Sequence, residues 1–582
     1  MGKQKDIPRP ESISIKRKDI WFAAACLVLI LLKYMLASQL PISPRPNYRT
    51  DDHLLVMMSR TMLAGRWLGN YGFGTLMKGS FYPMFLSVTH LSGIAYLSVL
   101  DLLNSAAALY FTLSLKRVLQ KRRWMLILLA VLLFNPVNTA EWTFGRIYRC
   151  SITNFQTLFL FGSVIAAYLD EKDSFGRQLA RALFCGLILW SAWNTREDAA
   201  WMLPFVLVAG IVMLVGRLKK QKEWKKIVCS AVLFMMPFLI LLGGNGVITL
   251  INNHYYGLPI RNEASAGFGE MLKTMYSIKN KEHIDHVSVS AEKLERMYAV
   301  SPTLRLIEPE LTESLLTADA NSDLNLNDGE VEDGWFYWCV RRAVENSGIA
   351  KTLPEADAFY RQITKELKEA ISDPANGFET QWVMPSALMS PWQPGYEKIF
   401  PGYILRAIKY TIKFDEVTAD PRIVGSTAER MSYLFEGITG NVSIHNAEDM
   451  TIVGNYRQIY IDRANAVTSV YQAVNPYIAI LSVVLFALQF ILAIVRRRTE
   501  EVPWLLIVTG IALSVLVLLI GIAYTDMTAF IAIRYTYISG GYALMLACEW
   551  IAILRAVNSG YDFMKSKKGG IRWLGKKRSL PS

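Results

Sequence analysis

Residues 472–495 read QAVNPYIAILSVVLFALQFILAIV, and Arg496-Arg497-Arg498 follows directly. An apolar run of this length allows an α-helix to cross the ~30 Å hydrocarbon core of a bilayer. Similar runs recur along the 582-residue chain, which is 52% hydrophobic and 19% charged, whereas soluble domains carry roughly 25% charged residues. A soluble enzyme, a coiled coil and a peripheral protein are therefore excluded. The sequence predicts an all-α polytopic membrane protein.

The apolar runs predict about ten transmembrane helices. They lie near residues 21–40, 95–115, 124–137, 151–169, 182–194, 199–216, 227–250, 472–495, 503–524 and 536–556. Lys and Arg in short loops resist translocation, so basic loops mark the cytoplasmic side. This scheme places every strongly basic segment on one side, with both termini cytoplasmic. The net charge of +13 therefore indicates orientation, and we expect no nucleic-acid partner.

The long segment between the seventh and eighth spans has the opposite charge balance. Residues 252–470 hold 31 Asp and Glu against 21 Lys and Arg, and the helical periodicity of Pro354–Ala370 predicts an amphipathic helix. We expect a mainly helical, extracytoplasmic acidic domain here. The predicted organisation is a basic N-terminus (1–20), a seven-helix membrane module (21–251), this domain (252–470), three C-terminal helices (471–557) and a basic tail (558–582).

The first outer loop, residues 41–93, carries a carboxylate pair, Asp51-Asp52, about ten residues beyond the first span. An amphipathic helix is expected from Asp52 to Gly65. A carboxylate near the headgroup plane could accept a proton from a hydroxyl nucleophile while cations hold a lipid phosphate. Asp is also common at helix starts. The alternative is therefore that Asp51 caps the helix and Asp52 is solvated.

This loop resembles the first outer loop of the GT-C glycosyltransferases, in the group of protein O-mannosyltransferases and lipid A aminoarabinose transferases. The resemblance rests on Asp51-Asp52, Gly65-x-Trp67-Leu68, Lys78 and Tyr82-Pro83. It is specific over about residues 48–85 and general over the first seven spans, so it implies a GT-C-like helix arrangement. It also implies that Asp51 is catalytic. The family usually has consecutive prolines after the lysine, where this chain has Gly79-Ser80.

Lys78 of this loop and charged residues in three other outer segments complete the predicted site. Lys78, Arg149, Arg196 and Arg534 are candidates to bind a donor phosphate, and Glu141, Glu197 and Asp198 are candidates to support the acceptor or a metal. Charged groups near membrane depth are costly unless they are paired or face a cavity. The alternatives are interfacial Tyr and Arg anchors for Arg149 and Arg534, and an exposed loop for Thr195–Asp198. No cofactor is certain, and a divalent metal stays open.

The leading hypothesis is an inverting glycosyltransferase that moves a sugar from a polyprenyl-phosphate-linked donor to a cell-envelope acceptor on the extracytoplasmic face. A lipid-linked donor fits because nucleotide sugars are not expected in that compartment. The alternatives are a polymerase or ligase of lipid-linked glycans and a transporter or receptor. Membrane lipids are expected partners. The chain has only six cysteines, and this low cysteine content favours a bacterial plasma membrane over an endoplasmic reticulum.

Overall fold

The computed structural model describes residues 17–45, 51–170, 173–220, 223–319, 326, 330–422, 429–444 and 454–576. Across these residues the chain is helical, and its β-structure is limited to isolated bridges. Eight helices of the described chain are long and apolar enough to cross a membrane. The prediction of an all-α polytopic membrane protein is confirmed.

Ten helices correspond to the ten predicted spans. They are α1 (Arg17–Ala37), α4 (Tyr96–Ser114), α6 (Arg122–Leu133), α7 (Thr153–Leu169), α8 (Phe175–Trp193), α9 (Leu203–Lys220), α10 (Trp224–Tyr256), α20 (Gly454–Val495), α21 (Val502–Thr528) and α22 (Tyr535–Lys576). Two of them, α6 and α8, are not among the eight apolar candidates. The 12 residues of α6 measure about 18 Å, less than the hydrocarbon core. The first turns of α8 carry Arg177 and Arg181.

Several of these helices expose apolar side chains that a soluble protein would bury. Tyr477, Ile480 and Val483 of α20 are exposed, as are Leu242 and Leu250 of α10. Such surfaces are expected where helices face lipid instead of water. The 42 residues of α20 measure about 63 Å, twice the hydrocarbon core, so this helix extends well beyond the membrane.

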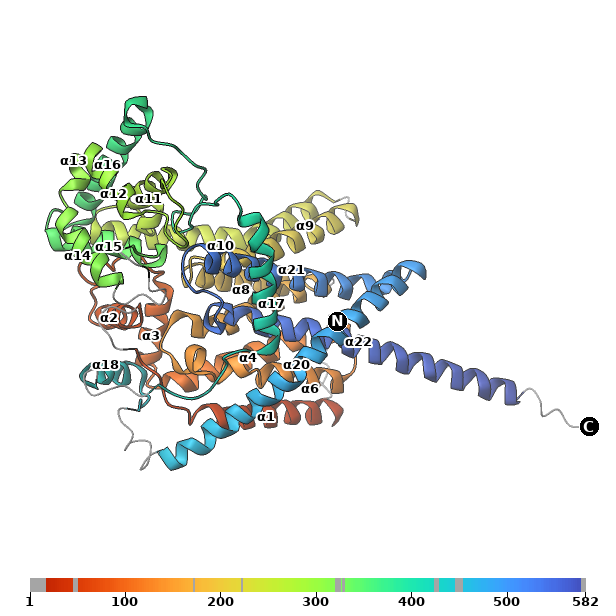
Figure 1. Cartoon of the computed structure of the whole chain (residues 1–582). Helices are drawn as coiled ribbons and strands as arrows, with labels where there is room; N and C mark the ends of the chain where they lie inside the picture. The colour runs from red at the N-terminus through yellow and green to blue at the C-terminus, as the bar shows by residue number, and fades with distance from the viewer. Residues whose placement is uncertain are drawn as a thin grey trace, which may run out of the picture.

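Most of the remaining helices gather at one end of the bundle (Figure 1). They are α2 (Asp51–Leu63), α3 (Phe81–Leu91), α11 (Gly267–Ser277), α12 (Ala291–Val300), α13 (Pro302–Arg305), α14 (Glu308–Asp319), α15 (Asp333–Ser347), α16 (Leu353–Ser372) and α18 (Glu429–Thr439), while α17 (Tyr396–Lys413) packs on α20 and α21. Short 3-10 or π turns occur at Pro136–Asn138, Glu141–Gly145, Arg149–Ile152, Ala199–Met202, Glu263–Ser265, Pro374–Asn376 and Thr499–Glu501. The predicted amphipathic helix in this region is α16, which begins with a Thr352–Glu355 capping box.

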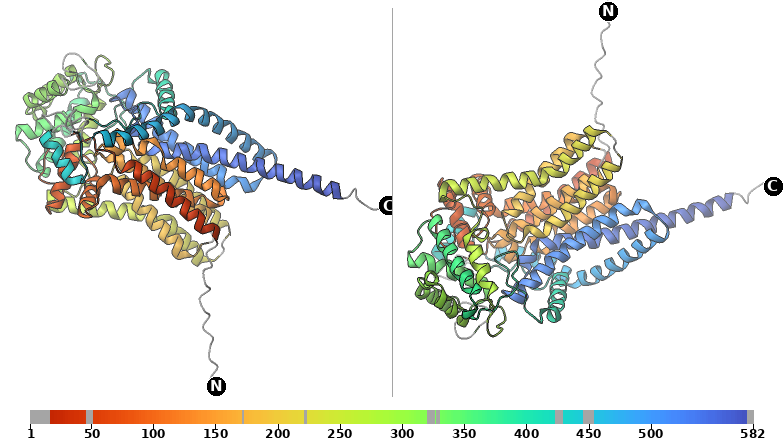
Figure 2. Two further views of the ribbon diagram at one scale, coloured as in Figure 1. Left: turned by 90° about the horizontal axis from the view of Figure 1, so that it is seen from below. Right: turned by 90° about the horizontal axis from the view of Figure 1, so that it is seen from above.

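The opposite end of the bundle collects basic loops. Figure 2 shows the end of α22 pointing away from α11–α16 in both views. At that end α5 (Lys116–Leu119) joins α4 to α6, and Arg122 pairs with Asp19 of α1. Asp170, just after α7, pairs with Lys116 at 3.6 Å and Arg117 at 2.7 Å. The α4–α6 corner therefore lies beside the start of α1 and the end of α7. Which compartment this end faces stays a prediction.

The first outer loop is locked onto the acidic domain by a buried arginine. Arg341 of α15 forms an ion pair with Glu263 at 2.5 Å, and both side chains are almost fully buried. It also donates hydrogen bonds to the carbonyls of Gly72 at 3.1 Å and Thr75 at 3.0 Å. Met77 continues the contact by packing into the domain's hydrophobic core. The buried charge of Arg341 is stabilised by its pairing with Glu263. Its hydrogen bonds to Gly72 and Thr75 hold the part of the loop that precedes Lys78.

Candidate active site

Asp51 and Lys78 meet at the domain end of the bundle. The Lys78 Nζ atom lies 3.0 Å from Asp51 Oδ2, and Tyr148 OH donates to the same oxygen at 3.2 Å. Asp51 is the first residue of α2, where the positive end of the helix dipole favours a carboxylate. Its side chain keeps 24% of its surface exposed while that of Lys78 keeps 8%. Asp51 is thus the more exposed member of a largely buried ion pair.

Gly79 lets the loop bring Lys78 to this position. The backbone passes so close to the end of α8 that a Cβ atom on Gly79 would lie 2.0 Å from the Asn194 carbonyl oxygen. The same carbonyl accepts a hydrogen bond from Phe81 N at 3.0 Å. Gly79 is the position at which this sequence departs from the GT-C proline pattern. At this position the backbone of Asn194 occupies the space that a side chain would need.

A second charge pair stands beside the first. Arg149 Nη1 donates to both carboxylate oxygens of Glu197, at 2.7 and 2.5 Å, and Arg149 Nε donates to Tyr148 OH at 3.2 Å. Tyr148 therefore contacts both Asp51 and Arg149. Two cations and two carboxylates, supplied by three outer segments, are linked through one hydroxyl group.

These charges control the ionisation of Asp51 and Lys78. Burial raises the pKa of Asp51, but the charges of Lys78 and Arg149 outweigh it and hold that pKa below its ordinary value. Burial lowers the pKa of Lys78, but the charge of Asp51 outweighs it and raises that pKa. Burial raises the pKa of Glu197, but Arg149 outweighs it and lowers that pKa. All three groups are charged at neutral pH.

The acidic domain contributes two aromatic residues that the sequence reasoning did not identify. Lys78 Nζ lies 5.0 Å from the centre of the Trp338 ring, a cation–π distance. Neighbouring Tyr337 has a pKa raised by burial and also subject to the charges of Lys78 and Asp51. The sequence feature that could have identified them is the aromatic run Trp335–Trp338, which lies within an acidic segment.

Asp52 is engaged in a different pair. Arg146 donates to it through two nitrogens, Nε to Oδ2 at 2.8 Å and Nη2 to Oδ1 at 2.6 Å, and Asp52 is completely buried. This burial contradicts the alternative in which Asp52 is solvated. No local sequence spacing could predict this role for Arg146, because the two residues lie 94 positions apart.

Arg534 lies in a cluster around Trp142 and not beside Lys78. The guanidinium groups of Arg45, Arg146 and Arg534 lie 3.8, 5.4 and 5.3 Å from the Trp142 ring centre. Glu141 lies 3.9 Å from Arg45, and burial raises the pKa of Glu141 to about 7 although Arg45 and Arg146 oppose the shift. The residues predicted to bind phosphate are thus divided between two neighbouring clusters.

Arg196 and Asp198 form a local pair within the predicted outer turn. Arg196 Nε donates to Asp198 Oδ1 at 2.7 Å, and Arg196 Nη1 lies 2.9 Å from Cys150 Sγ. The guanidinium also lies 5.9 Å from the Tyr537 ring centre. Arg196 is largely buried while Asp198 is 40% exposed. The turn is therefore anchored in the bundle through its arginine, and its carboxylates reach the surface.

Within the described residues, no three His, Cys, Asp or Glu side chains are grouped to hold a metal ion. The carboxylates Asp51, Asp52, Glu197 and Asp198 each pair with a cation instead. Two cavities occur among the described residues, and neither is lined by Asp51 or Lys78. One of about 200 Å³ lies between the first outer loop and α15–α16, and one of about 890 Å³ lies at the other end of the bundle.

Comparison with known proteins gives little further information. No family model and no curated protein matches the chain. The crystal structure of ArnT from Cupriavidus metallidurans in the apo state is similar at 13% sequence identity and a TM-score of 0.29, with 92% of this chain and 77% of that chain covered. A likeness at this level does not extend to function.

Proposed function

We propose that the protein is an integral-membrane glycosyltransferase that moves a sugar from a polyprenyl-phosphate donor to a cell-envelope acceptor, with inversion at the anomeric carbon. The observation that carries the proposal is the convergence of Asp51, Lys78, Arg149 and Glu197 at one end of the bundle. A carboxylate beside two buried cations supplies a base and a phosphate-binding group together. The motif Asp51-Asp52, Trp67 and Lys78 supports the same proposal.

In the proposed reaction an acceptor hydroxyl attacks the anomeric carbon as the bond to the phosphate oxygen breaks. The leaving phosphate keeps the electron pair of that bond, and Asp51 takes the hydroxyl proton. Lys78 and Arg149 stabilise the negative charge that develops on the phosphate, where charge-assisted hydrogen bonds are strong. The net change is one C–O bond formed and one broken.

The ion pairs of the resting site suggest how donor binding activates the base. Lys78 lowers the pKa of Asp51, and a low pKa makes a carboxylate a weak proton acceptor. An incoming phosphate competes with Asp51 and Glu197 for Lys78 and Arg149. Once these cations turn to the phosphate, Asp51 loses its main stabilising partner and becomes more basic. The donor thereby prepares its own catalyst.

The test is sugar transfer by purified protein from a panel of polyprenyl-phosphate sugars, in wild type and in Asp51→Asn. Removing a general base lowers the rate about 10²–10⁴-fold, and we expect Asp51→Asn to remain folded at the assay temperature. The matched control is Asp173→Asn. That carboxylate pairs with Arg181 at 2.7 Å and is 19% exposed, but lies at the opposite end of the bundle. Transfer by Asp51→Asn at the wild-type rate would contradict the catalytic role.

The phosphate-binding role is tested separately by donor affinity. We expect Lys78→Gln and Arg149→Gln to weaken donor binding by roughly 1.5–3 kcal/mol each, the range for charge-assisted hydrogen bonds. Lys in place of Arg149 should restore only part of the loss, because it lacks the guanidinium fork. Arg196→Gln and Arg534→Gln are the comparison set. If only Arg534→Gln weakens binding, the donor phosphate lies near Trp142, and if only Arg196→Gln does, it lies near Cys150 and Tyr537.

A further inference from the structure

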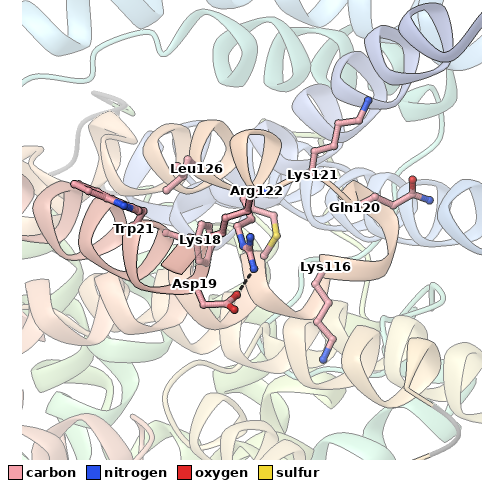
Figure 3. Close-up of a pocket in the computed structure, with 10 residues that line it drawn as sticks. Lys18, Asp19, Trp21, Lys116, Gln120, Lys121, Arg122 and Leu126 are labelled. Atoms are coloured by element: carbon pink, nitrogen blue, oxygen red, sulfur yellow. Dashed lines mark hydrogen bonds and ion pairs between the residues drawn. The ribbon is translucent and has the colours of Figure 1, made fainter. Parts of the chain in front are cut away.

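A second group of charged side chains lies around a cavity at the end of the bundle opposite Asp51. A cavity of about 890 Å³ opens between the start of α1 and the corner formed by α5 and α6. Figure 3 shows side chains from these segments around it. Its lining combines polar residues (Lys18, Asp19, Lys116, Gln120, Lys121 and Arg122) with apolar ones (Trp21, Phe22, Met125 and Leu126).

The charge of this pocket favours an anion. Four lysine and arginine side chains line it against the single carboxylate of Asp19, and one of the four, Lys116, also pairs with Asp170 outside the lining. Asp19 and Arg122 point toward one another and form an ion pair across the pocket (Figure 3). With Asp19 and Asp170 both counted against the four cations, the charge around the pocket is still positive.

The start of α6 adds to the positive potential. The corner turns at Gln120, whose φ is 59°, and α6 begins at Arg122 with no side-chain cap on its N-terminus. Unsatisfied backbone N–H groups and the helix dipole make such an end positive, and Lys121 and Arg122 place two more positive charges there. Like charges at this end are unfavourable, and a bound anion would offset them.

The surroundings of the pocket indicate that the anion belongs to a lipid. Trp21 is 66% exposed at its rim, and tryptophan side chains are enriched at the membrane–water interface. From Ile20 onward α1 exposes an apolar face that includes Leu27 and Leu31. An anionic headgroup in the pocket would continue directly into acyl chains along this face. A free anion would make no use of it.

We propose that this pocket binds the phosphate headgroup of an anionic phospholipid from the leaflet at this end of the bundle. Basic pockets between transmembrane helices are known to take such headgroups. Lys121 and Arg122 contact the phosphate oxygens, Lys18 and Lys116 lie at its sides, and Trp21 covers the glycerol region. The site is independent of the proposed transferase activity.

Native mass spectrometry of the detergent-purified full chain tests the proposal. Phosphatidylglycerol and phosphatidylcholine with the same acyl chains are titrated in turn, and we expect the anionic lipid to bind at least tenfold more tightly. The double variant Lys121→Gln/Arg122→Gln should weaken phosphatidylglycerol binding by tenfold or more. Equal binding of the two lipids, or an unchanged affinity in the double variant, would overturn the assignment.

Two controls separate this site from general charge effects. Arg123→Gln removes a neighbouring cation that stacks 4.3 Å over Trp124 and does not line the pocket, so it should leave lipid affinity unchanged. An equal loss in Arg123→Gln would mean that binding follows net charge only and would overturn the proposal. Lys18→Gln, on α1, supplies a second pocket variant if the double variant does not fold. Displacement of the lipid by inorganic phosphate at the same concentration would identify a free-anion site and overturn the lipid assignment.

Discussion

At the scale of single residues, the neighbours Asp51 and Asp52 have different surroundings. Asp51 is partly exposed and shares Lys78 and Tyr148, whereas Asp52 is fully buried and bound by two nitrogens of Arg146. A buried carboxylate held in this way contributes to structure because breaking the pair leaves an uncompensated charge. We therefore propose a chemical role for Asp51 and a positioning role for Asp52.

This proposal predicts that substitutions of Asp51 and Asp52 change the free energy of unfolding by different amounts. Asp52→Asn should lower the free energy of unfolding by about 3–5 kcal/mol, the range for removal of one partner from a buried pair, while Asp51→Asn should lower it less, because Asp51 keeps 24% of its surface exposed. The measurement is thermal unfolding in detergent. Glu223→Gln is the control, since Glu223 and Lys226 are both largely exposed and such pairs contribute at most about 1 kcal/mol. A small effect of Asp52→Asn would refute the structural role.

Glu141 predicts a pH dependence. Its pKa is raised by burial to about 7 from an ordinary value of 4.5, so the folded state binds the proton more tightly than the unfolded state. The associated stability is fully present below pH 4.5 and is lost as the pH rises through 7, by about 3 kcal/mol at 1.36 kcal/mol per unit. Glu141→Gln should remove this dependence, so the variant gains stability relative to wild type between pH 5 and 8. A constant difference in unfolding temperature over that range would contradict the shift.

At the scale of elements, the site depends on the contact between the first outer loop and the end of α8. Gly79 approaches the Asn194 carbonyl, and Phe81 N donates to it. From the other side, Arg341 of α15 binds the carbonyls of Gly72 and Thr75. Lys78 is thus placed by backbone contacts on both sides of its loop and not by its local sequence.

Gly79→Ala should therefore disturb the site without changing any charged group. A Cβ atom 2.0 Å from a carbonyl oxygen forces the two backbones apart, and overpacking of this kind costs about 1–3 kcal/mol. We expect a lower unfolding temperature and at least a tenfold loss of transfer activity. Gly216→Ala in α9 is the control, because nothing lies within 4 Å of its added methyl group. Equal behaviour of the two variants would show that the contact is not needed.

At the scale of the whole molecule, the two ends of the bundle differ in kind. One end holds α11–α16 (Figures 1 and 2) and the Asp51 site, and the other holds the basic corner and the 890 Å³ pocket (Figure 3). Charge asymmetry of this sort orients membrane proteins because basic loops remain in the cytoplasm. We propose that the acidic domain faces outward.

Cysteine labelling tests this orientation. In a Cys229→Ser background, which removes an exposed native thiol, Thr312→Cys in α14 should react with an impermeant maleimide in intact cells. Thr499→Cys, between α20 and α21, should react only after permeabilisation. Both positions are exposed to solvent, so access to the reagent decides the outcome. The reverse pattern would invert the orientation and place the Asp51 site inside.

The sequence by itself determined the helical membrane class and the positions of ten helices. Long apolar runs such as residues 472–495 must satisfy their backbone hydrogen bonds within a helix when they lie in lipid. A local sequence pattern therefore decides the local structure. The amphipathic helix α16 followed from periodicity for the same reason. The ends of α10 and α20 were less predictable, because both helices continue into polar sequence outside the membrane.

The tertiary structure alone decided which charged residues meet. Arg146 lies 94 positions from Asp52, and Glu197 lies 48 positions from Arg149, so these pairs form only when the outer segments are brought together. The same reason separates Arg534, which lies against Trp142, from Lys78, which lies against Trp338. Pairing between buried charges depends on distance in space, and sequence spacing carries no information about it.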